Sequence, residues 1–335
     1  MRLNVVMTPP HAEGSGQRAR GRLMAAARSL EAAGVTALVL DRPAPTDHPH
    51  GVPAFEAVTL AALLARTTSR IGLVAADSAL FGYPYNTARR LASLDHLSGG
   101  RSGWRPVTSP DDGDEAVYGL TVGGPDEQRS RAAEFVEVLL ALWDTWEPGA
   151  ELPDKAAGNF RDDTQIHPID HRSTYYRVHG PLDVPRCPQG RPVIVRAVRT
   201  PDELAMAARF ADVVEPWCAN EAELAETVTA VRAAAGRAGR SPTELLVLPA
   251  LGWRAGPEVV SIGERDLSQR LGDVVTSVGA DGATLVGPGT PEWAEALAGD
   301  VLPALRGLLA RPRAGATLAE NYGLRRSAET DRSVA

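Results

Sequence analysis

The sequence contains little cysteine and few aromatic residues, and both shortages restrict what it can form. Its 335 residues include two cysteines, Cys187 and Cys218, in no spacing typical of a disulfide framework or a metal site. Such cysteine usage is typical of the reducing cytoplasm. Aromatic residues make up 5% of the chain and hydrophobic residues 44%, so we expect a large core built mostly of alanine, valine and leucine.

An excess of positive charge and long apolar runs are also missing. The formal net charge is -7 and the pI about 5.6, so nucleic acid and anionic membranes, which attract basic surfaces, are not predicted as partners. No apolar run approaches the roughly 18 residues of a membrane-spanning helix. The first residues, MRLNVVMTPPHAEG, lack the apolar stretch of a signal peptide. The sequence therefore predicts a cytoplasmic protein.

Three motifs of catalysis and nucleotide binding are absent. The chain contains no Walker A phosphate loop, no G-x-G-x-x-G and no G-x-S-x-G. The first two absences exclude a nicotinamide-binding domain of its own, and the third excludes the serine of a nucleophile elbow.

Short apolar runs alternate with longer helical patterns. Continuous apolar runs are typical of strands buried on both faces, as in a parallel sheet. Helices are predicted over Arg18–Ala33, Arg129–Trp146, Glu221–Ala235 and from Pro291 to about Ala310. The predicted strands are Leu3–Val6, Ala37–Leu40, Ile71–Ala76, Ser102–Val107, Pro192–Ala197, Asp212–Val214, Leu245–Leu251 and Ala283–Val286. Eight such units predict an α/β fold closed into a (β/α)8 barrel of the TIM type.

One stretch interrupts this alternation. Pro148 to Gly190 is polar and rich in proline and histidine, which predicts an insertion after the fourth βα unit, with a hairpin of Ile166–Asp170 and Tyr175–Val178. No Gly, Ser or Pro linker divides the chain. We therefore expect one barrel domain over residues 1–326 and a flexible tail from Ser327 to Ala335.

Candidate chemistry lies at the carboxyl ends of the strands, where barrels of this type place their working residues. Asp41 and Glu215 are the carboxylates there, and they form either a hydrolase pair or, as we favour, helix caps or partners of arginines. Arg196 and Arg199 precede Thr200, which begins the next helix. These three residues form either an anion site or a helix cap with two solvated arginines.

The histidines offer little catalytic promise. His167 and His171 are four residues apart, but they lie in a proline-containing loop without a third ligand in register, so no metal site is expected. His96 ends a predicted helix, where an imidazolium can interact with the helix dipole, and we expect a structural role.

Several longer segments carry a resemblance to a known family. They read FEAVTLAALLARTTSRIGL from Phe55, PYNTARRLASLDHLSGGRSGW from Pro84 and AAEFVEVLLALWDTWE from Ala132, followed by IHPIDH from Ile166 and NYGLRR from Asn321. They closely resemble the nitrilotriacetate monooxygenase branch of the bacterial luciferase-like flavin monooxygenases. The resemblance covers most of residues 20–326.

The resemblance implies a dimeric barrel that binds reduced FMN supplied by a separate flavin reductase. The reduced flavin would react with oxygen, and a small organic substrate would be oxidised. The partner chain would be a second copy or a related subunit. The positions that match flavin contacts of the family are Asp41, Ala76, Asp77, Arg105, Arg196, Arg199 and Thr200.

Departures from the family cluster at these positions. Ala76 stands for a threonine, Arg105 for an asparagine, and Pro125 and Arg129 for a histidine and a tyrosine. Val198 and Glu203 replace glycines of the phosphate loop, where a Cβ blocks close approach of the backbone. An exposed Glu203 would repel phosphate by about 0.5–1 kcal/mol. We therefore expect altered flavin affinity, and a non-catalytic subunit of a heterodimeric monooxygenase is the alternative to the enzyme.

Overall fold

The backbone forms a barrel of parallel strands. The computed structural model describes residues 1–8, 16–41, 55–111, 113–154, 158–241, 244–263 and 267–324. The strands follow the order β11-β10-β9-β4-β3-β2-β1-β14-β12-β13, and their pairings are parallel. Their bounds are β1 (Arg2–Met7), β2 (Ala37–Leu40), β3 (Gly72–Ser78), β4 (Ser102–Val107), β9 (Val193–Val198), β10 (Val213–Pro216), β11 (Leu246–Val247), β12 (Ala250–Gly252), β13 (Val260–Ser261) and β14 (Gly282–Val286). The predicted barrel is confirmed and seven of the eight predicted strands are present as single strands, whereas β13 was not predicted.

The seventh predicted strand, Leu245–Leu251, is broken in two and closes the barrel. Its first part, β11, pairs with β10, and its second part, β12, pairs with β14. Pro249 lies between them and has no N–H to donate to a ladder. Hydrogen bonds continue on either side, from the Leu248 amide to the Val214 carbonyl at 2.8 Å and from the Thr284 amide to the Pro249 carbonyl at 2.9 Å.

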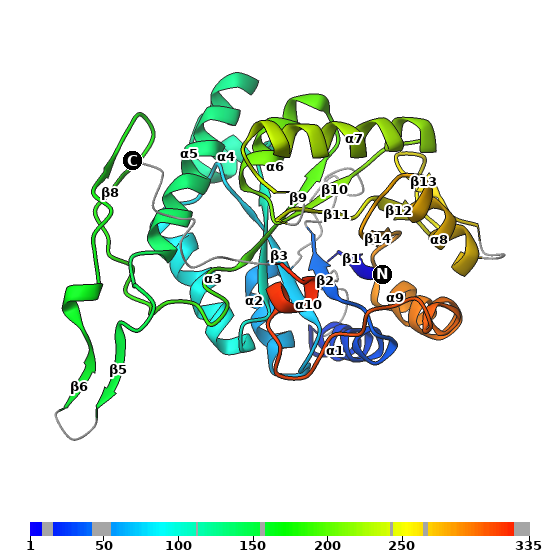
Figure 1. The fold of residues 1–335 in the computed structure, drawn as a ribbon, viewed down its shortest axis with the longest axis horizontal. Helices are drawn as coiled ribbons and strands as arrows, with labels where there is room; N and C mark the ends of the chain where they lie inside the picture. Colours follow the sequence, from blue (N-terminus) through cyan, green and yellow to red (C-terminus); the bar gives the residue numbers. More distant parts are fainter. Residues whose placement is uncertain are drawn as a thin grey trace.

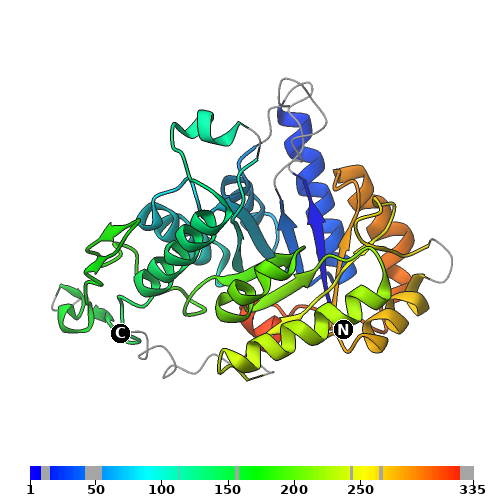
Figure 2. The ribbon, with the colours of Figure 1, turned by 90° about the horizontal axis from the view of Figure 1, so that it is seen from above.

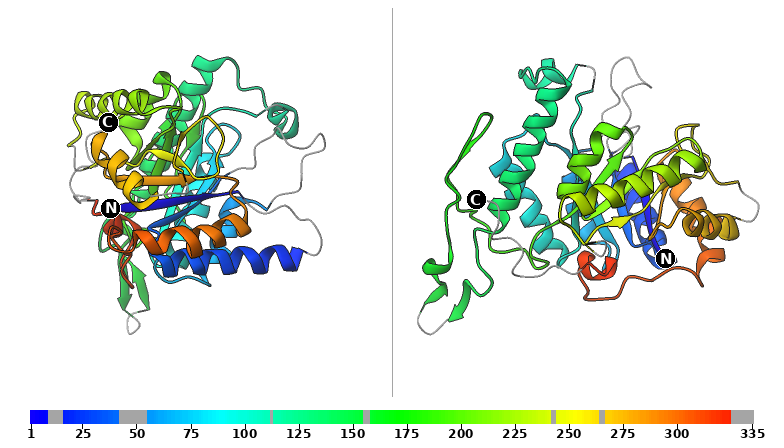
Figure 3. Two further views of the ribbon diagram at one scale, coloured as in Figure 1. Left: turned by 90° about the vertical axis from the view of Figure 1, so that its right-hand side faces the viewer. Right: turned by 45° about the horizontal axis from the view of Figure 1, so that its top comes forward.

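Helices surround the strands, as Figure 1 and Figure 2 show from two directions. The helices α1 and α9 lie side by side (Figure 3), and Arg22 of α1 donates to Glu292 of α9 at 2.7 Å. None of the described helices is both long and apolar enough to cross a membrane. The bounds are α1 (Gly16–Ala33), α2 (Ala57–Ala65), α3 (Pro84–Ser98), α4 (Asp114–Tyr118), α5 (Pro125–Trp143), α6 (Leu204–Phe210), α7 (Glu221–Arg237), α8 (Leu267–Ser277), α9 (Pro291–Ala296) and α10 (Leu318–Tyr322).

The last long helix is shorter than predicted. The sequence predicts a helix from Pro291 to about Ala310, but α9 ends at Ala296. The backbone then continues as a π-helical turn, η4 (Leu297–Val301), and a 3₁₀ turn, η5 (Leu302–Leu305). Pro303 cannot donate the hydrogen bond that a regular α-helix requires there.

The segment between α5 and β9 lies outside the barrel, at the left of Figure 1. It contains two antiparallel hairpins. The pair β7 (His171–Arg172) and β8 (Arg177–Val178) corrects the predicted hairpin, because β8 lies within the predicted second strand but β7 follows the predicted first strand, Ile166–Asp170. The pair β5 (Glu151–Asp154) and β6 (Asn159–Arg161) was not predicted. A short 3₁₀ turn, η2 (Asp163–Gln165), joins the two hairpins. The predicted tail, Ser327–Ala335, lies outside the described residues.

A short helix near the end of the described chain closes the bottom of the barrel. Buried aliphatic side chains of the strands pack there against Leu318 and Tyr322 of α10. The Leu318 amide donates to the Gly100 carbonyl just before β4, so α10 lies at the amino ends of the strands. A Cβ on Gly72 would lie 2.3 Å from the Leu318 Cδ1. The carboxyl ends are therefore the open end, where chemistry is expected.

Candidate active site

A pocket of about 640 Å³ opens at the carboxyl ends of β4 and β9, between α5 and α6. Its volume lies within the range of about 300–1,000 Å³ that is typical of ligand and cofactor sites. Its lining combines apolar side chains with four arginines. The lining residues are Thr108, Ser109, Pro125, Gln128, Arg129, Ser130, Ala133, Arg196, Arg199, Thr200, Asp202, Glu203, Ala205, Met206, Arg209 and Phe210.

Arg196 lies in β9, two residues before the end of that strand, and is 6% exposed. Its Nη1 donates to the Pro106 carbonyl at 2.9 Å, and its Nη2 donates to Thr108 Oγ1 at 2.6 Å and to Glu203 Oε1 at 3.1 Å. Burial lowers the pKa of Arg196, and the Glu203 carboxylate opposes that effect. The guanidinium is thus held by the carboxyl end of β4 and by one carboxylate.

Glu203 ends the 3₁₀ turn η3 (Pro201–Glu203), and its side chain turns back onto the loop after β9. Its Oε2 accepts from the Arg199 amide at 2.6 Å and from the Thr200 amide at 3.2 Å. Thr200 has the extended backbone of an N-cap residue, with φ -134° and ψ 154°. Of the interpretation as a helix cap with two solvated arginines, the cap is present and Arg199 is exposed, but Arg196 is buried and paired with Glu203.

Arg199 presents a cation at the edge of the pocket. Its guanidinium carbon lies 4.0 Å from the centroid of the Trp217 ring, a geometry in which the ring face attracts a cation. Unlike the other pocket arginines, Arg199 makes no ion pair with any residue that the structure describes. It is the pocket cation best placed to meet an anionic ligand.

The remaining two arginines of the pocket are paired. Arg129 contacts Asp126 within α5 and lies 3.7 Å from Asp202. Arg209 of α6 contacts Glu137 of α5 at 2.8 Å, a link between the two helices that frame the pocket. The positive charge of the lining is therefore largely compensated before any ligand arrives.

Beside this pocket, inside the barrel, Arg105 of β4 lies between two carboxylates. Its Nη1 donates to Asp41 Oδ2 at 2.6 Å, and its Nη2 donates to Glu215 Oε2. Arg105 is 3% exposed and Glu215 is fully buried. Burial lowers the pKa of Arg105, and Asp41 opposes that effect. The carboxylates Asp41 and Glu215 thus converge, but on a shared arginine, as the favoured interpretation predicted.

A chain of buried polar side chains continues from Glu215 to the bottom of the barrel. Its Oε1 accepts from Thr284 Oγ1 at 2.6 Å and from Asn4 Nδ2 at 3.2 Å. The Asn4 Oδ1 in turn accepts from the hydroxyl of Tyr322 at 2.7 Å. Burial raises the pKa of Tyr322, which keeps the hydroxyl protonated and donating. Hydrogen bonds therefore connect Glu215, at the open end of the barrel, through Asn4 to Tyr322 of α10 at the other end.

Ala76 and Asp77 lie on β3, the strand next to the β4 residue Arg105, and face opposite sides of β3. Ala76 pairs in register with Arg105 and by alternation faces the barrel interior, as Val74 does. Asp77 Oδ2 accepts from Arg90 of α3 at 2.6 Å. Burial raises the pKa of Asp77, and Arg90 opposes it. The Asp77 side chain therefore contacts the surrounding helices, whereas Ala76 faces the open end of the barrel interior.

The histidines of the insertion each contact a carboxylate. His167 lies 3.2 Å from Glu147, His171 lies 3.0 Å from Glu134 of α5, and His179 contacts Asp170. Because their partners differ, His167 and His171 do not converge on one point. His96 Nε2 lies 3.2 Å from the Pro185 carbonyl, which ties α3 to the segment before β9.

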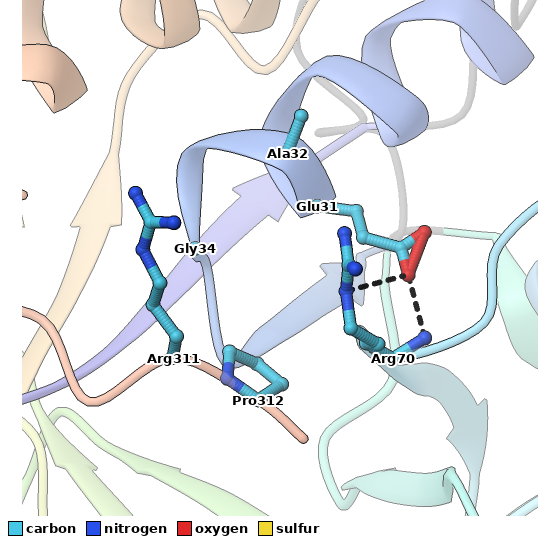
Figure 4. A pocket seen from close by; sticks show the side chains of 6 residues that line it. All are labelled: Glu31, Ala32, Gly34, Arg70, Arg311 and Pro312. Carbon is cyan, nitrogen blue, oxygen red and sulfur yellow. Dashed lines mark hydrogen bonds and ion pairs between the residues drawn. The ribbon is translucent and has the colours of Figure 1, made fainter. Parts of the chain in front are cut away.

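A second, smaller cavity of about 110 Å³ lies at the opposite end of the barrel (Figure 4). Glu31 of α1 dominates it, and its carboxylate accepts from the Ser69 amide at 2.9 Å and the Arg70 amide at 2.5 Å. Figure 4 shows this carboxylate turned toward Arg70 just before β3. This end of such barrels serves stability, so we assign the cavity no chemistry.

The structure sorts the residues singled out from the sequence into two neighbouring groups. Arg196, Arg199 and Thr200 line the large pocket, together with Pro125 and Arg129. Asp41, Ala76 and Arg105 lie at the barrel mouth, and Asp77 faces the helices instead.

Sequence reasoning missed Asn4, Thr284 and Tyr322. The first two carried a signal, because each is a polar residue within an otherwise apolar strand.

The residues of this region fit a flavin in size and in hydrogen-bonding character. Four buried N–H groups near the strand ends have no acceptor among the described residues, and an orphaned donor costs about 1–3 kcal/mol. They are Arg105 Nε, Arg196 Nε, Trp217 Nε1 and Trp253 Nε1. Arg196 lines the pocket, whereas the Trp253 ring packs against Trp293 of α9. The edge of a flavin ring offers nitrogen and oxygen acceptors. The fit is poorest at Glu203, whose carboxylate already holds the loop amides.

Comparison with known proteins identifies a family for this chain. Residues 1–252 match the luciferase-like monooxygenase family. N-acetyl-S-(2-succino)cysteine monooxygenase of Bacillus subtilis (strain 168) is 39% identical over 211 residues, which are 61% of this chain and 46% of that protein. Nitrilotriacetate monooxygenase component A of Aminobacter aminovorans is 40% identical over 195 residues, or 58% and 43%. This chain thus matches less than half the length of both.

Two further comparisons extend the likeness. One of the pristinamycin IIA synthase subunits of Streptomyces pristinaespiralis is 36% identical over 175 residues, which are 52% of this chain and 56% of that protein. The structure of an EDTA monooxygenase from Chelativorans sp. BNC1 superposes with a TM-score of 0.82 and 25% identity, covering 97% of this chain and 99% of that one.

The fold and the site together define an α/β barrel with a cofactor-sized pocket at the carboxyl ends of its strands. The chain belongs to the luciferase-like monooxygenase family. The resemblance to its nitrilotriacetate monooxygenase branch is confirmed.

Proposed function

We propose that this chain is the oxygenase component of a two-component monooxygenase that uses reduced flavin to oxidise a small organic substrate in the cytoplasm. The observation that carries the proposal is the pocket of about 640 Å³ at the carboxyl ends of β4 and β9. Arg196, Arg199 and Thr200, which the family resemblance assigns to the cofactor, line this pocket. The Nε of Arg196, which has no acceptor among the described residues, adds further support.

The residues of the two groups would hold opposite ends of the flavin. Ala76 and Arg105 would contact the ring at the barrel mouth, where Asp41 and Glu215 fix the Arg105 side chain. Arg199 and Thr200 would contact the far end of the ribityl chain. Reduced flavin, when bound, supplies the two electrons that activate dioxygen.

Rigid positioning would be the main contribution of the protein's own side chains. Arg105 is locked by two carboxylates, so its planar guanidinium can support a ring without reorganising when the ligand binds. The apolar part of the pocket, which includes Met206 and Phe210, would exclude water from the part of the flavin that lies there. The substrate would be selected by the loops after the strands, which vary freely on this fold.

A flavin reductase is the expected partner, because the sequence has no dinucleotide motif of its own. We further propose that the chain dimerises, either with a second copy or with a related subunit. Among the relatives, the nitrilotriacetate monooxygenase component and the pristinamycin IIA synthase subunit are both named as parts of larger systems.

Anaerobic titration with reduced flavin tests this proposal. Saturable binding, followed by substrate-dependent oxygen consumption when a reductase and NADH are added, is the expected result. A chain that binds no reduced flavin alone but does so with a related subunit would instead be the non-catalytic member of a heterodimer.

A further inference from the structure

The Glu203 carboxylate occupies the place in the pocket where an oxyanion would bind. Its two oxygens accept from the amides of Arg199 and Thr200 at 2.6 and 3.2 Å and from Arg196 Nη2 at 3.1 Å. Two backbone amides and one guanidinium are the donors that a phosphate group would use. Here they are already engaged by a residue of the chain itself.

This arrangement differs from an ordinary helix cap elsewhere in the same molecule. Glu320 closes an equivalent capping box with Thr317 at the start of α10 and accepts from its amide at 2.7 Å. Glu320 is exposed and makes no ion pair with a described residue. Glu203, in contrast, neutralises Arg196, which is 6% exposed. Removing the partner of a buried charge is costly, so Glu203 is held in place by more than the cap.

Most of the positive charge around the pocket is already compensated by carboxylates, so an additional anion would find little attraction there. Arg129, Arg196 and Arg209 each contact a carboxylate, and Arg199 alone among the pocket arginines makes no ion pair with a described residue. A phosphate monoester carries nearly two negative charges at neutral pH. Bound here, it would meet one uncompensated arginine and the repulsion of Glu203.

A neutral polyol suits the same place better. It can donate to carboxylates and accept from the Arg199 guanidinium. The apolar lining, including Ala133, Met206 and Phe210, remains available to the rest of the ligand.

We propose that Glu203 is a specificity-determining residue that makes this pocket select riboflavin, the flavin without a phosphate, over FMN. This inference rests on the proposed function, because it concerns which form of the flavin is bound. Glu203 acts by filling the anion position and by repelling a second anion beside it. Such repulsion between partly exposed groups corresponds to about a tenfold difference in affinity.

The variant Glu203→Gln isolates the charge. The amide oxygen of glutamine can still accept from the two loop amides, so the start of the helix is preserved, while Arg196 loses its counter-charge. Glu320→Gln makes the same change in the capping box of α10, outside the pocket, and serves as the matched control.

The experiment measures binding of reduced riboflavin and reduced FMN by anaerobic equilibrium ultrafiltration. In the unmodified protein, riboflavin should bind at least as tightly as FMN. Glu203→Gln should raise the affinity for FMN relative to that for riboflavin about tenfold, and Glu320→Gln should leave this ratio unchanged. An unmodified protein that binds FMN much more tightly than riboflavin, or a ratio unchanged by Glu203→Gln, would overturn the inference and leave the proposed function standing.

Failure of the proposed function gives a different pattern, in which neither flavin binds any of the three proteins. Titration with inorganic phosphate, followed by tryptophan emission because Arg199 lies against Trp217, then decides the role of Glu203. A saturable response in Glu203→Gln that is missing from the unmodified protein supports the proposal that Glu203 excludes an anion. An equal response in both proteins, or none in either, contradicts it.

Discussion

Arg105 of β4 and Glu215 of β10 form an ion pair inside the barrel, although 110 residues separate them in the sequence. Asp41 contacts the other terminal nitrogen of Arg105, so one guanidinium holds three strand ends together. The pair lies at the open end of the barrel, beside the pocket proposed to bind flavin. Its presence has consequences for stability as well as for ligand binding.

Replacing Arg105 by methionine should destabilise the protein strongly. The substitution leaves the fully buried Glu215 carboxylate without its cation, and breaking a buried pair in this way costs about 3–5 kcal/mol. Urea unfolding at neutral pH measures the loss. The matched control is Arg22→Met, which breaks the exposed pair with Glu292 and should cost about 1 kcal/mol or less.

A second substitution tests the cause of that loss. Glu215→Gln added to Arg105→Met removes the uncompensated charge while an amide oxygen can still accept from Thr284. The double variant should recover part of the lost free energy of unfolding. An Arg105→Met protein as stable as the Arg22→Met control would contradict the assignment.

Some features of this barrel could be predicted from the sequence and others could not. Most of the strands were predictable because they are short, mainly apolar runs, but the continuous leucines around Pro249 hide the break between β11 and β12, and the two-residue β13 was not predicted. The hairpin of β5 and β6 was missed because Asn159–Arg161 is exposed on both faces and shows no alternation. Sequence periodicity arises from the alternation of buried and exposed residues, so a hairpin that is exposed on both faces shows no such pattern.

The site was predictable by position and not by pairing. Strand ends identified Asp41, Arg105, Arg196 and Arg199, because barrel geometry fixes where those ends lie. The contact of Glu203 with its own loop amides depends on a side-chain rotamer, which no spacing encodes.

The close packing of α10 against the bottom of the barrel leaves no space for a side chain at Gly72. An alanine at Gly72 would place its Cβ 2.3 Å from Leu318 Cδ1, closer than packed atoms approach, so Gly72→Ala should lower the free energy of unfolding by about 1–3 kcal/mol. Gly21→Ala, with nothing within 4 Å of the new Cβ in α1, should instead be neutral or slightly stabilising. Thermal unfolding compares the two.

The same contact can be tested from its other side. Leu318→Ala alone should cost about 2–5 kcal/mol through the cavity it leaves. Combined with Gly72→Ala, it should cost less than the sum of the two single changes, because the clash is relieved. Strict additivity would show that the two residues do not touch.

The hydrogen bonds of Glu134 should make the stability of the insertion depend on pH. Burial raises its pKa, but hydrogen bonds from His171 and from the amides of Tyr176 and Tyr175 outweigh burial and lower the pKa below its ordinary value of 4.5. A lowered carboxyl pKa stabilises the folded state above the unfolded pKa, and this contribution is lost as the pH falls through the folded value.

Hydrogen exchange of residues 171–178 measures this effect directly. Corrected for intrinsic rates, exchange should be slow at pH 6 and faster below pH 4.5. In Glu134→Gln the titrating group is gone, so the acid-dependent change should be small. Equal pH dependence in both proteins would assign the effect to another group.

Arg199 predicts a loss of ligand affinity without a loss of stability. Its guanidinium is exposed and stacks on Trp217, so Arg199→Ala should change the free energy of unfolding by about 1 kcal/mol or less. Affinity for reduced flavin should fall about tenfold, since a direct contact to the ligand is removed. Arg22→Ala, in a surface pair between α1 and α9, is the control and should leave binding unchanged.

The central claim, that this chain uses reduced flavin, is tested most directly by one titration. The purified protein is titrated with reduced flavin under strictly anaerobic conditions, and bound flavin is measured by ultrafiltration. We expect saturable binding at micromolar concentration with one flavin per chain, abolished or weakened by Arg199→Ala. No binding at millimolar flavin would contradict it.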